Sequence, residues 1–192
     1  MCGIVSYIGH QDPVPILIKG LRRLEYRGYD SAGLALLDGK NLSSIKKAGK
    51  VSDLSDKVSS KSIQGTCGIA HTRWATHGVP NDTNAHPHLD KTGKIALVHN
   101  GIIENYDSIK KTLEGRGVVF KSETDSEVLV QLISELYYKG EGDLDFKDAV
   151  KAALQEVVGA YGIVAMCSDE PNTLVAARMG SPLVLGVGDD EF

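Results

Sequence analysis

Cys2, the second residue of the chain, could supply both a nucleophile and a proton acceptor. The chain opens Met1-Cys2-Gly3-Ile4-Val5, and removal of Met1 ahead of so small a side chain would make Cys2 the amino terminus. Its thiol would then attack a substrate, and its α-amine, with a pKa of about 7.7–8.0, would take and return the proton near neutral pH. A retained Met1 would tie that amine into a peptide bond and remove the base. Taken alone, Cys2 is better explained as a small hydrophobic residue that starts an edge strand.

The segment 71–78 gathers an Arg, two His, two Thr and the only Trp of the chain at the end of a predicted strand. It reads His-Thr-Arg-Trp-Ala-Thr-His-Gly and leads into a polar loop, residues 73–89, whose length is typical of a functional loop. The planar guanidinium of Arg73 can bind a carboxylate through two hydrogen bonds. Considered singly, Arg73 is better explained by a surface salt bridge and Trp74 by a place in the core.

A third segment, residues 99–105, follows another predicted strand and reads His-Asn-Gly-Ile-Ile-Glu-Asn. Attack of a thiol on an amide creates a tetrahedral oxyanion, which needs preorganised hydrogen-bond donors. The side-chain amide of Asn100 and the backbone N–H of Gly101 could supply two. Asn-Gly is equally typical of a hairpin turn, so the spacing alone leaves both interpretations open.

The segment 122–127, Ser-Glu-Thr-Asp-Ser-Glu, opens a predicted helix. Thr124 and Glu127 have the spacing of a capping box, and Asp125 in a first helical turn is favourable for the helix dipole. These local roles explain the segment without any function. As a binding residue, Asp125 would instead be the counter-charge of an ammonium group, and with Arg73 it would clamp both charged groups of an amino acid.

The chain is rich in potential metal ligands, but their spacing does not predict a metal site. They lack the close Cys and His pairs of zinc sites. The tail Gly186-Val187-Gly188 is too short a pattern to predict a phosphate loop. We therefore predict neither a metal nor a cofactor. The potential ligands are His71, His77, His86, His88, His99, Cys2 and Cys67.

The composition fits a single enzyme domain. The chain has 192 residues, of which 42% are hydrophobic, enough to fill one core. The net charge of −4 and the dispersed basic residues give no nucleic-acid footprint. No apolar run reaches the length of a membrane span, and the start lacks the features of a signal peptide. Three cysteines favour a reduced, cytoplasmic setting, with Cys67 and Cys167 as buried structural thiols.

Apolar periodicity predicts strands and helices in mixed groups, without regular βαβα alternation. This order favours the α+β class, with antiparallel sheets covered by helices. The chain ends just past its last predicted strand, so we expect it to be part of a longer protein. Strands are expected at 3–8, 34–37, 66–70, 94–99, 163–166, 174–177 and 183–187, and helices at 13–24, 105–115 (capped by Asn105), 124–140 and 146–157, with 50–60 weakly helical.

Taken together, these segments resemble the class II glutamine amidotransferases over essentially the whole chain. The resemblance is carried by the opening five residues, the run 21–33 and the segments 71–78, 99–105 and 122–127. The strings Tyr-Arg-Gly-Tyr-Asp-Ser-Ala-Gly and His-Thr-Arg-Trp-Ala-Thr-His-Gly are long and specific. They are similar to the glutaminase domains of the glutamine–fructose-6-phosphate aminotransferases, as are Ala-His-Pro-His at 85–88 and the string at 176–183. Amidophosphoribosyltransferases and asparagine synthetases match these strings less well.

The resemblance implies a fold and a reaction. The fold is the four-layer αββα sandwich of N-terminal-nucleophile hydrolases, and the chain would be a single type-2 glutamine amidotransferase domain. Cys2 would attack the side-chain amide of glutamine and form a glutamyl thioester, with Asn100 and Gly101 as the oxyanion hole. Arg27 lies near the nucleophile in this family, without a chemical role that we can assign. We expect Arg27 and His86 to support the site.

The resemblance also implies how glutamine is held. Arg73 would bind its carboxylate and Asp125 its ammonium group. Thr76 and His77 would support the loop that closes over the substrate, and Trp74 would gate the passage of ammonia.

In the whole enzyme, the resemblance implies a C-terminal sugar-phosphate isomerase half that these 192 residues lack. That half would use the ammonia to convert fructose 6-phosphate to glucosamine 6-phosphate and would hold a homo-oligomer together. The implied partners are L-glutamine and this isomerase domain, with no nucleic acid or membrane. Because ammonia stays nucleophilic only when shielded from water, the chain alone should release it to solvent.

Three other interpretations stay open. The chain could be the glutaminase half of another class II amidotransferase or a stand-alone amidase, which the identity of the missing domain would decide. It could be a catalytically silent module that senses glutamine or a sugar, which would bind glutamine without turnover and tolerate Cys2→Ser. It could also be a metal-binding module, which metal analysis would reveal.

Overall fold

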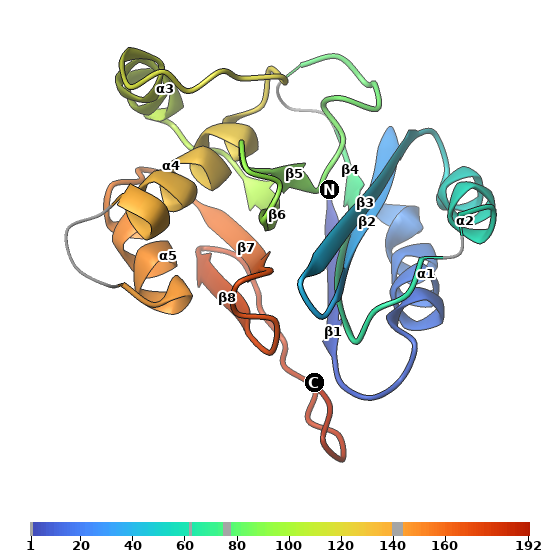
Figure 1. Ribbon diagram of the computed structural model, residues 1–192. Coiled ribbons are helices and arrows are strands. Elements are labelled where there is room, and N and C mark those ends of the chain that lie inside the picture. The colour runs from blue at the N-terminus through green and yellow to red at the C-terminus, as the bar shows by residue number, and fades with distance from the viewer. Residues whose placement is uncertain (1, 62, 75–77, 140–143) are drawn as a thin grey trace.

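Two four-stranded antiparallel sheets face each other at the centre of the computed structural model, with helices outside both (Figure 1). The structure describes residues 2–61, 63–74, 78–139 and 144–192. The first sheet has the strand order β1-β4-β2-β3, formed by Gly3–Ile8, Cys67–Arg73, Ser31–Asp38 and Asn41–Ala48. The second has the order β5-β6-β7-β8, formed by His88–Leu89, Ile95–Gly101, Tyr161–Cys167 and Leu174–Met179.

The helices form the two outer layers. The first sheet is covered by α1 (Pro13–Leu24) and α2 (Val51–Ser59), and the short 3-10 turn η1 (Glu25–Arg27) follows α1. The second sheet is covered by α3 (Tyr106–Gly115), α4 (Asp125–Lys139) and α5 (Phe146–Gln155). The expected α+β class and αββα layering are thus confirmed. In the described part of the chain, no helix is long and apolar enough to cross a membrane.

The inner strands β2, β4, β6 and β7 are buried on both faces, and side-chain alternation sends neighbouring residues to different layers. In β2, Leu34 and Leu36 pack in the cluster beneath α1 and α2. Ala35 and Leu37 of the same strand pack in the cluster between the two sheets. This double burial explains why the strands read in the sequence as continuous apolar runs.

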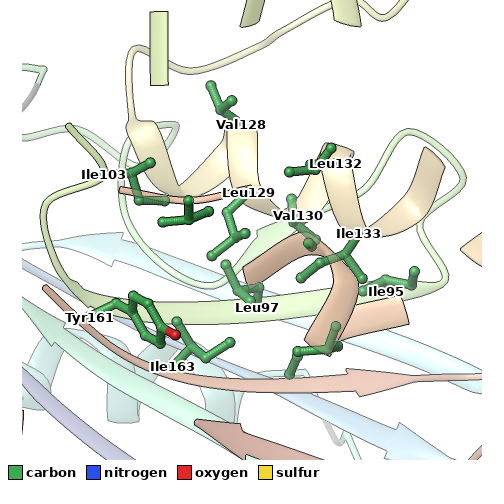
Figure 2. Packing of buried hydrophobic residues seen from close by; sticks show 14 of the residues in the cluster. Ile95, Leu97, Ile103, Val128, Leu129, Val130, Leu132, Ile133, Tyr161 and Ile163 are labelled. Carbon is green, nitrogen blue, oxygen red and sulfur yellow. The ribbon is translucent and has the colours of Figure 1, made fainter. Parts of the chain in front are cut away.

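The second sheet follows the same rule. Ile95 and Leu97 of β6 point toward Leu129 and Ile133 of α4 (Figure 2), while Val98 enters the layer between the sheets. Fully burying one such Leu or Ile side chain stabilises a fold by about 1.5–3 kcal/mol. The core therefore fixes the position of β6, whose last residues reach the candidate site.

Two predicted helix starts are confirmed in whole or in part. Asp12 caps α1 by accepting a hydrogen bond from Val14 N at 3.0 Å. At α4, Thr124 Oγ1 accepts from Glu127 N at 3.2 Å, which is one half of the predicted capping box. The other half is missing, because the Glu127 carboxylate instead accepts hydrogen bonds from the backbone of Lys121 and from Ser122 Oγ.

The predicted cap of α3 is wrong. Asn105 makes no side-chain capping bond. Its Nδ2 donates to Glu156 O at 2.8 Å and its Oδ1 accepts from Val158 N at 3.0 Å. The Asn105 amide therefore holds the segment that leads from α5 into β7. Its hydrogen bonds go to these distant backbone groups and not to the first turn of α3.

The strand predicted at 183–187 is also wrong. Residues 181–192 carry no helix or strand, and Val184 is 91% exposed. An apolar run becomes a strand only when a neighbouring strand accepts its backbone hydrogen bonds. In this terminal segment the backbone pairs with β1 at Phe192 instead: Phe192 N donates to Ile8 O at 2.9 Å, and Ile8 N donates to Phe192 O at 3.0 Å. The other predicted strands are present, most of them a few residues longer than expected.

Candidate active site

Strand ends bring the candidate residues together. β1 runs antiparallel to β4 with Gly3 opposite Thr72, so Cys2 lies beside Arg73 and Trp74, where β4 ends. In the second sheet, β6 ends at Asn100 and Gly101. A contact of 2.8 Å between His71 Nε2 and Asn100 Oδ1 joins the two sheets at this point.

A cavity of about 970 Å³ opens between these strand ends. Every predicted site residue that the structure describes lines it, so their convergence, which the spacing could not show, is now established. The predicted residues Thr76 and His77 lie outside the described residues. The predicted site residues that line the cavity are Cys2, Arg27, Arg73, Trp74, His86, Asn100, Gly101 and Asp125.

The Cys2 thiol is half-buried against the backbone of Trp74. Its Sγ accepts a hydrogen bond from Trp74 N at 3.1 Å and lies 3.5 Å from Trp74 O. Burial raises the pKa of the Cys2 thiol, and the N–H of Trp74 acts in the opposite direction more weakly. The net rise keeps the group a thiol at neutral pH, so a reaction at Cys2 needs a base to remove its proton.

Asn100 and Gly101 face the thiol from the second sheet. Asn100 Nδ2 lies 3.4 Å from Cys2 O, the carbonyl of the nucleophile itself. Gly101 has a φ of +133°, and a Cβ at this position would lie 2.1 Å from Ala160 O, so only glycine fits. The Asn-Gly pair forms the end of a strand and not the hairpin turn that was the alternative.

Arg73 is a buried arginine whose head group lines the cavity. Its side chain is 4% exposed, with Nη1 3.7 Å from Asp30 Oδ1. Nη2 donates to Gly78 O at 3.2 Å and Nη1 to Val79 O at 3.5 Å. The alternative of a surface salt bridge is therefore wrong. The guanidinium is held by the carboxylate of Asp30 and by two loop carbonyls, which fixes a positive charge beside the cavity.

Asp125 begins α4 and is also buried, with 4% exposure. Its Oδ2 accepts a hydrogen bond from Ile103 N at 2.9 Å, just past the end of β6, and lies 3.9 Å from His99 Nδ1. The hydrogen bond from Ile103 N gives Asp125 a structural role at the start of α4. The same carboxylate nevertheless lines the cavity that contains Arg73, so the cavity wall has both signs of charge.

Trp74 is not a core residue, because it is 54% exposed. Its ring lies over Gly28, where an added Cβ would be 2.4 Å from Trp74 Cε3, and Gly28 has a φ of +95°. Arg27, one residue earlier in the turn η1, lines the cavity. The Tyr-Arg-Gly-Tyr string therefore shapes the rim beside the thiol.

A cluster of buried histidines backs the cavity. Burial lowers the pKa of His71 to about 3 and lowers the pKa of His86 and of His88 well below 6.5. These rings are therefore neutral at physiological pH. Ser126 Oγ lies 2.8 Å from His86 Nε2 and 2.9 Å from His99 Nδ1, which ties the cluster to α4. Among the described residues, no group of three or more His, Cys, Asp or Glu is placed to hold a metal ion.

Sequence reasoning missed the supporting residues of the site. His71 and His99 lie inside the quoted motifs, but their spacing did not predict the residues that they contact. Asp30 and Ser126 also lie in those motifs, yet their contacts with Arg73 and with the histidines depend on strand register. The only available signal was their membership of the same short strings.

The chain belongs to the glutamine amidotransferase domain family, whose family model matches residues 71–191. The glutamine–fructose-6-phosphate aminotransferase (isomerizing) of Bacteroides thetaiotaomicron is 58% identical to it over 193 residues. The enzyme of the same name from Chlorobaculum tepidum is 56% identical over 195 residues. Both alignments cover 100% of this chain and 31% of the relative, so the chain spans about a third of the length of these curated relatives.

Solved structures agree on the fold. The glutamine phosphoribosylpyrophosphate amidotransferase of B. subtilis, solved with ADP and GMP, matches with a TM-score of 0.77 and 28% identity, over 93% of this chain and 37% of that one. A glutamine aminotransferase class-II domain protein from Silicibacter pomeroyi matches with a TM-score of 0.54 and 17% identity, over 96% of this chain and 79% of that one. The second likeness concerns the fold alone.

Proposed function

We propose that the chain hydrolyses the side-chain amide of L-glutamine, with Cys2 as the nucleophile. The observation that carries this proposal is the single cavity shared by the Cys2 thiol, the Asn100 amide and two oppositely charged side chains, Arg73 and Asp125. Glutamine has an amide at one end and a carboxylate and an ammonium group at the other. Its functional groups therefore match those of the cavity wall, and membership of the glutamine amidotransferase family supports the match.

The reaction proceeds through a thioester. Cys2 Sγ bonds to the amide carbon of glutamine, and the thiol proton passes to the α-amine of a processed amino terminus. Asn100 Nδ2 and the N–H of Gly101 hold the resulting oxyanion. The C–N bond then breaks, the protonated α-amine returns its proton to the leaving nitrogen, and ammonia departs. Water, activated by the same amine, attacks the thioester, releases glutamate and restores the thiol.

Substrate orientation comes from the charged residues. The guanidinium of Arg73 receives the α-carboxylate, and the carboxylate of Asp125 receives the α-ammonium group. Both residues are buried, and such placement strengthens a charge pair with the substrate because little water competes. Thr76 and His77 complete the loop over glutamine in this proposal.

The rim residues have secondary roles. Trp74 gates the departure of ammonia in this proposal, and its exposed ring on Gly28 supports the role. Arg27 and His86 support the cavity wall, His86 through its contact with Ser126. None of these roles involves a cofactor or a metal.

In the longer protein, the ammonia serves the conversion of fructose 6-phosphate to glucosamine 6-phosphate by a C-terminal isomerase domain of the same chain. The names of the two relatives and the 31% share of their length that this chain covers support this part of the proposal. Residues 1–192 are then one type-2 glutamine amidotransferase domain of a cytoplasmic homo-oligomer.

A product assay tests the proposal. The purified protein, with its amino terminus checked by intact mass, is given L-glutamine without fructose 6-phosphate. We expect glutamate and ammonia in equal amounts, and no turnover in Cys2→Ala. Cys167→Ala, which removes a buried thiol from β7, is the matched control and should keep the activity. Turnover that survives Cys2→Ala would contradict the proposal, and tight binding of glutamine without turnover would favour the silent binding module.

A further inference from the structure

A buried histidine holds Asn100 from behind. His71 Nε2 lies 2.8 Å from Asn100 Oδ1, and His71 is 0% exposed. We propose that His71 is a positioning residue that orients the Asn100 amide so that its Nδ2 faces the oxygen of the carbonyl attacked by Cys2. The inference rests on the glutaminase reaction proposed above, and it adds a residue whose role the sequence did not indicate.

Strand register creates this contact. In β4, the side chain of Ile69 enters the apolar layer between the sheets, and His71, two residues further on, faces the same layer. In β6, Val98 enters that layer, and Asn100 follows two residues later. The two polar side chains therefore meet at the edge of an apolar layer, where each needs the other as a hydrogen-bond partner.

The contacts fix which atom of each group is which. Asn100 Nδ2 is directed at Cys2 O, and a carbonyl oxygen can only accept a hydrogen bond. Oδ1 is therefore the atom that faces His71. Since Oδ1 also only accepts, His71 must carry its hydrogen on Nε2. Burial keeps the ring neutral, as the lowered pKa of His71, about 3, indicates, so this tautomer is the one present at neutral pH.

Orientation of the amide decides whether it helps or hinders catalysis. With Nδ2 toward Cys2, Asn100 presents a donor to the oxyanion. A flipped amide would present Oδ1, whose lone pairs repel a negative charge. Its Nδ2–H could then be accepted only if His71 moved its hydrogen from Nε2 to Nδ1, a buried nitrogen with no hydrogen-bond partner among the described residues. The His71 ring is itself held, because the His86 ring lies against it with 4.2 Å between ring centroids. The donor on His71 thus disfavours the wrong amide orientation.

Substitutions at position 71 can separate two roles of His71: orienting the Asn100 amide and filling space in the core. His71→Gln keeps an N–H donor of similar reach, whereas His71→Leu keeps volume and deletes the donor. Because loss of a whole oxyanion donor costs about 10²–10³-fold in kcat, we expect His71→Leu to lower kcat for L-glutamine by about 10–100-fold with little change in KM, and His71→Gln to stay within about threefold of wild type. In an Asn100→Ala background, His71→Leu should change kcat by less than about twofold, because the residue it positions is gone.

A second readout reports on the oxyanion directly. An aldehyde analogue of glutamine adds to the Cys2 thiol and forms a hemithioacetal whose oxygen occupies the oxyanion position. His71→Leu should weaken this inhibitor by the same factor as kcat and leave the affinity for L-glutamate unchanged. His88→Leu is the matched control: it removes a buried histidine that contacts Thr124 Oγ1, and it should leave the ratio of aldehyde to glutamate affinity unchanged.

Each failure has a distinct meaning. Equal losses of kcat in His71→Leu and His71→Gln, or a full further loss in the Asn100→Ala background, would overturn the proposal and make His71 a packing residue. Wild-type kcat in His71→Leu would overturn it as well. If the wild-type protein showed no Cys2-dependent turnover, the proposed function itself would fail. Circular dichroism checks that each variant is folded, and His71→Met replaces His71→Leu if the latter unfolds.

Discussion

The backbone N–H of Trp74 donates a hydrogen bond to the sulfur of Cys2 at 3.1 Å, across 72 positions of sequence. The contact exists because β1 and β4 pair with Gly3 opposite Thr72, which places the residue before one strand against the residue after the other. In the proposed mechanism, the backbone of the ammonia gate, Trp74, is therefore hydrogen-bonded to the nucleophile, Cys2. A movement of the segment after β4 would change the hydrogen bond to the thiol.

The packing of Trp74 on Gly28 gives a first prediction. A methyl group at Gly28 would meet the ring at 2.4 Å and would also be strained at a φ of +95°, so Gly28→Ala should displace Trp74. Because Trp74 is the only tryptophan of the chain, its intrinsic fluorescence should change in intensity or wavelength. Gly115→Ala, where a Cβ would meet nothing within 4 Å, should leave the spectrum as it is. An unchanged spectrum in Gly28→Ala would show that the ring does not depend on this contact.

Arg73 should determine the affinity for the α-carboxylate. Arg73→Lys keeps the positive charge but loses the planar fork, so KM for L-glutamine should rise about 10–100-fold with a smaller effect on kcat. A substrate without the carboxylate, 4-aminobutanamide, should be nearly insensitive to the same substitution. Equal losses on both substrates would mean that Arg73 acts only through its contacts with Asp30, Gly78 and Val79.

Asp125 should act through its charge. Asp125→Asn keeps an oxygen for Ile103 N and loses the negative charge, so KM should rise about tenfold while stability is nearly retained. Asp125→Ala should also destabilise the fold by about 1–3 kcal/mol, since the buried N–H of Ile103 loses its acceptor. Urea unfolding measures the second effect. Glutaramate, which lacks the α-amine, is the control substrate, and a loss of its hydrolysis in Asp125→Asn would argue against the ammonium contact.

The buried histidines predict loss of stability in acid. The pKa values of His71, His86 and His88 are lower in the folded protein than the ordinary value of 6.5, so the unfolded chain binds more protons as the pH falls. Stability present above pH 6.5 is therefore lost as the pH drops below it, by up to about 1.4 kcal/mol per pH unit for each histidine. Urea unfolding between pH 7 and 4.5 measures this slope. His88→Leu should lower this slope by the contribution of one histidine, up to about 1.4 kcal/mol per pH unit. An unaltered slope would contradict a lowered pKa of His88 in the folded protein.

The sequence predicted the fold where burial is local and failed where partners are distant. The runs that became β2 and β6 are apolar on both faces, which indicates strands inside a sandwich. Asn105 looked like a helix cap, but its amide binds Glu156 and Val158. The run 183–187 has the composition of a strand, yet composition does not provide a pairing partner.

The site shows the same division. Residue type alone favoured structural explanations for Cys2, Arg73 and Asp125 and left Asn100 open. The resemblance of the combined segments to a family indicated their chemistry, and the structure places all four on one cavity. The contact between His71 and Asn100 was out of reach, because it depends on the register of two strands that lie in different sheets. The residues that carry the chemistry can be selected by the resemblance of their segments to a family, whereas the residues that orient them are found only in three dimensions.

Direct detection of the covalent intermediate tests the central claim. The protein is mixed with L-glutamine, quenched in acid within the first turnovers, and its intact mass and peptides are measured. We predict a mass increase of one glutamyl group on the peptide that contains Cys2, absent in Cys2→Ala. Turnover of glutamine with no such adduct, or an adduct on Cys67 or Cys167, would contradict Cys2 as the nucleophile.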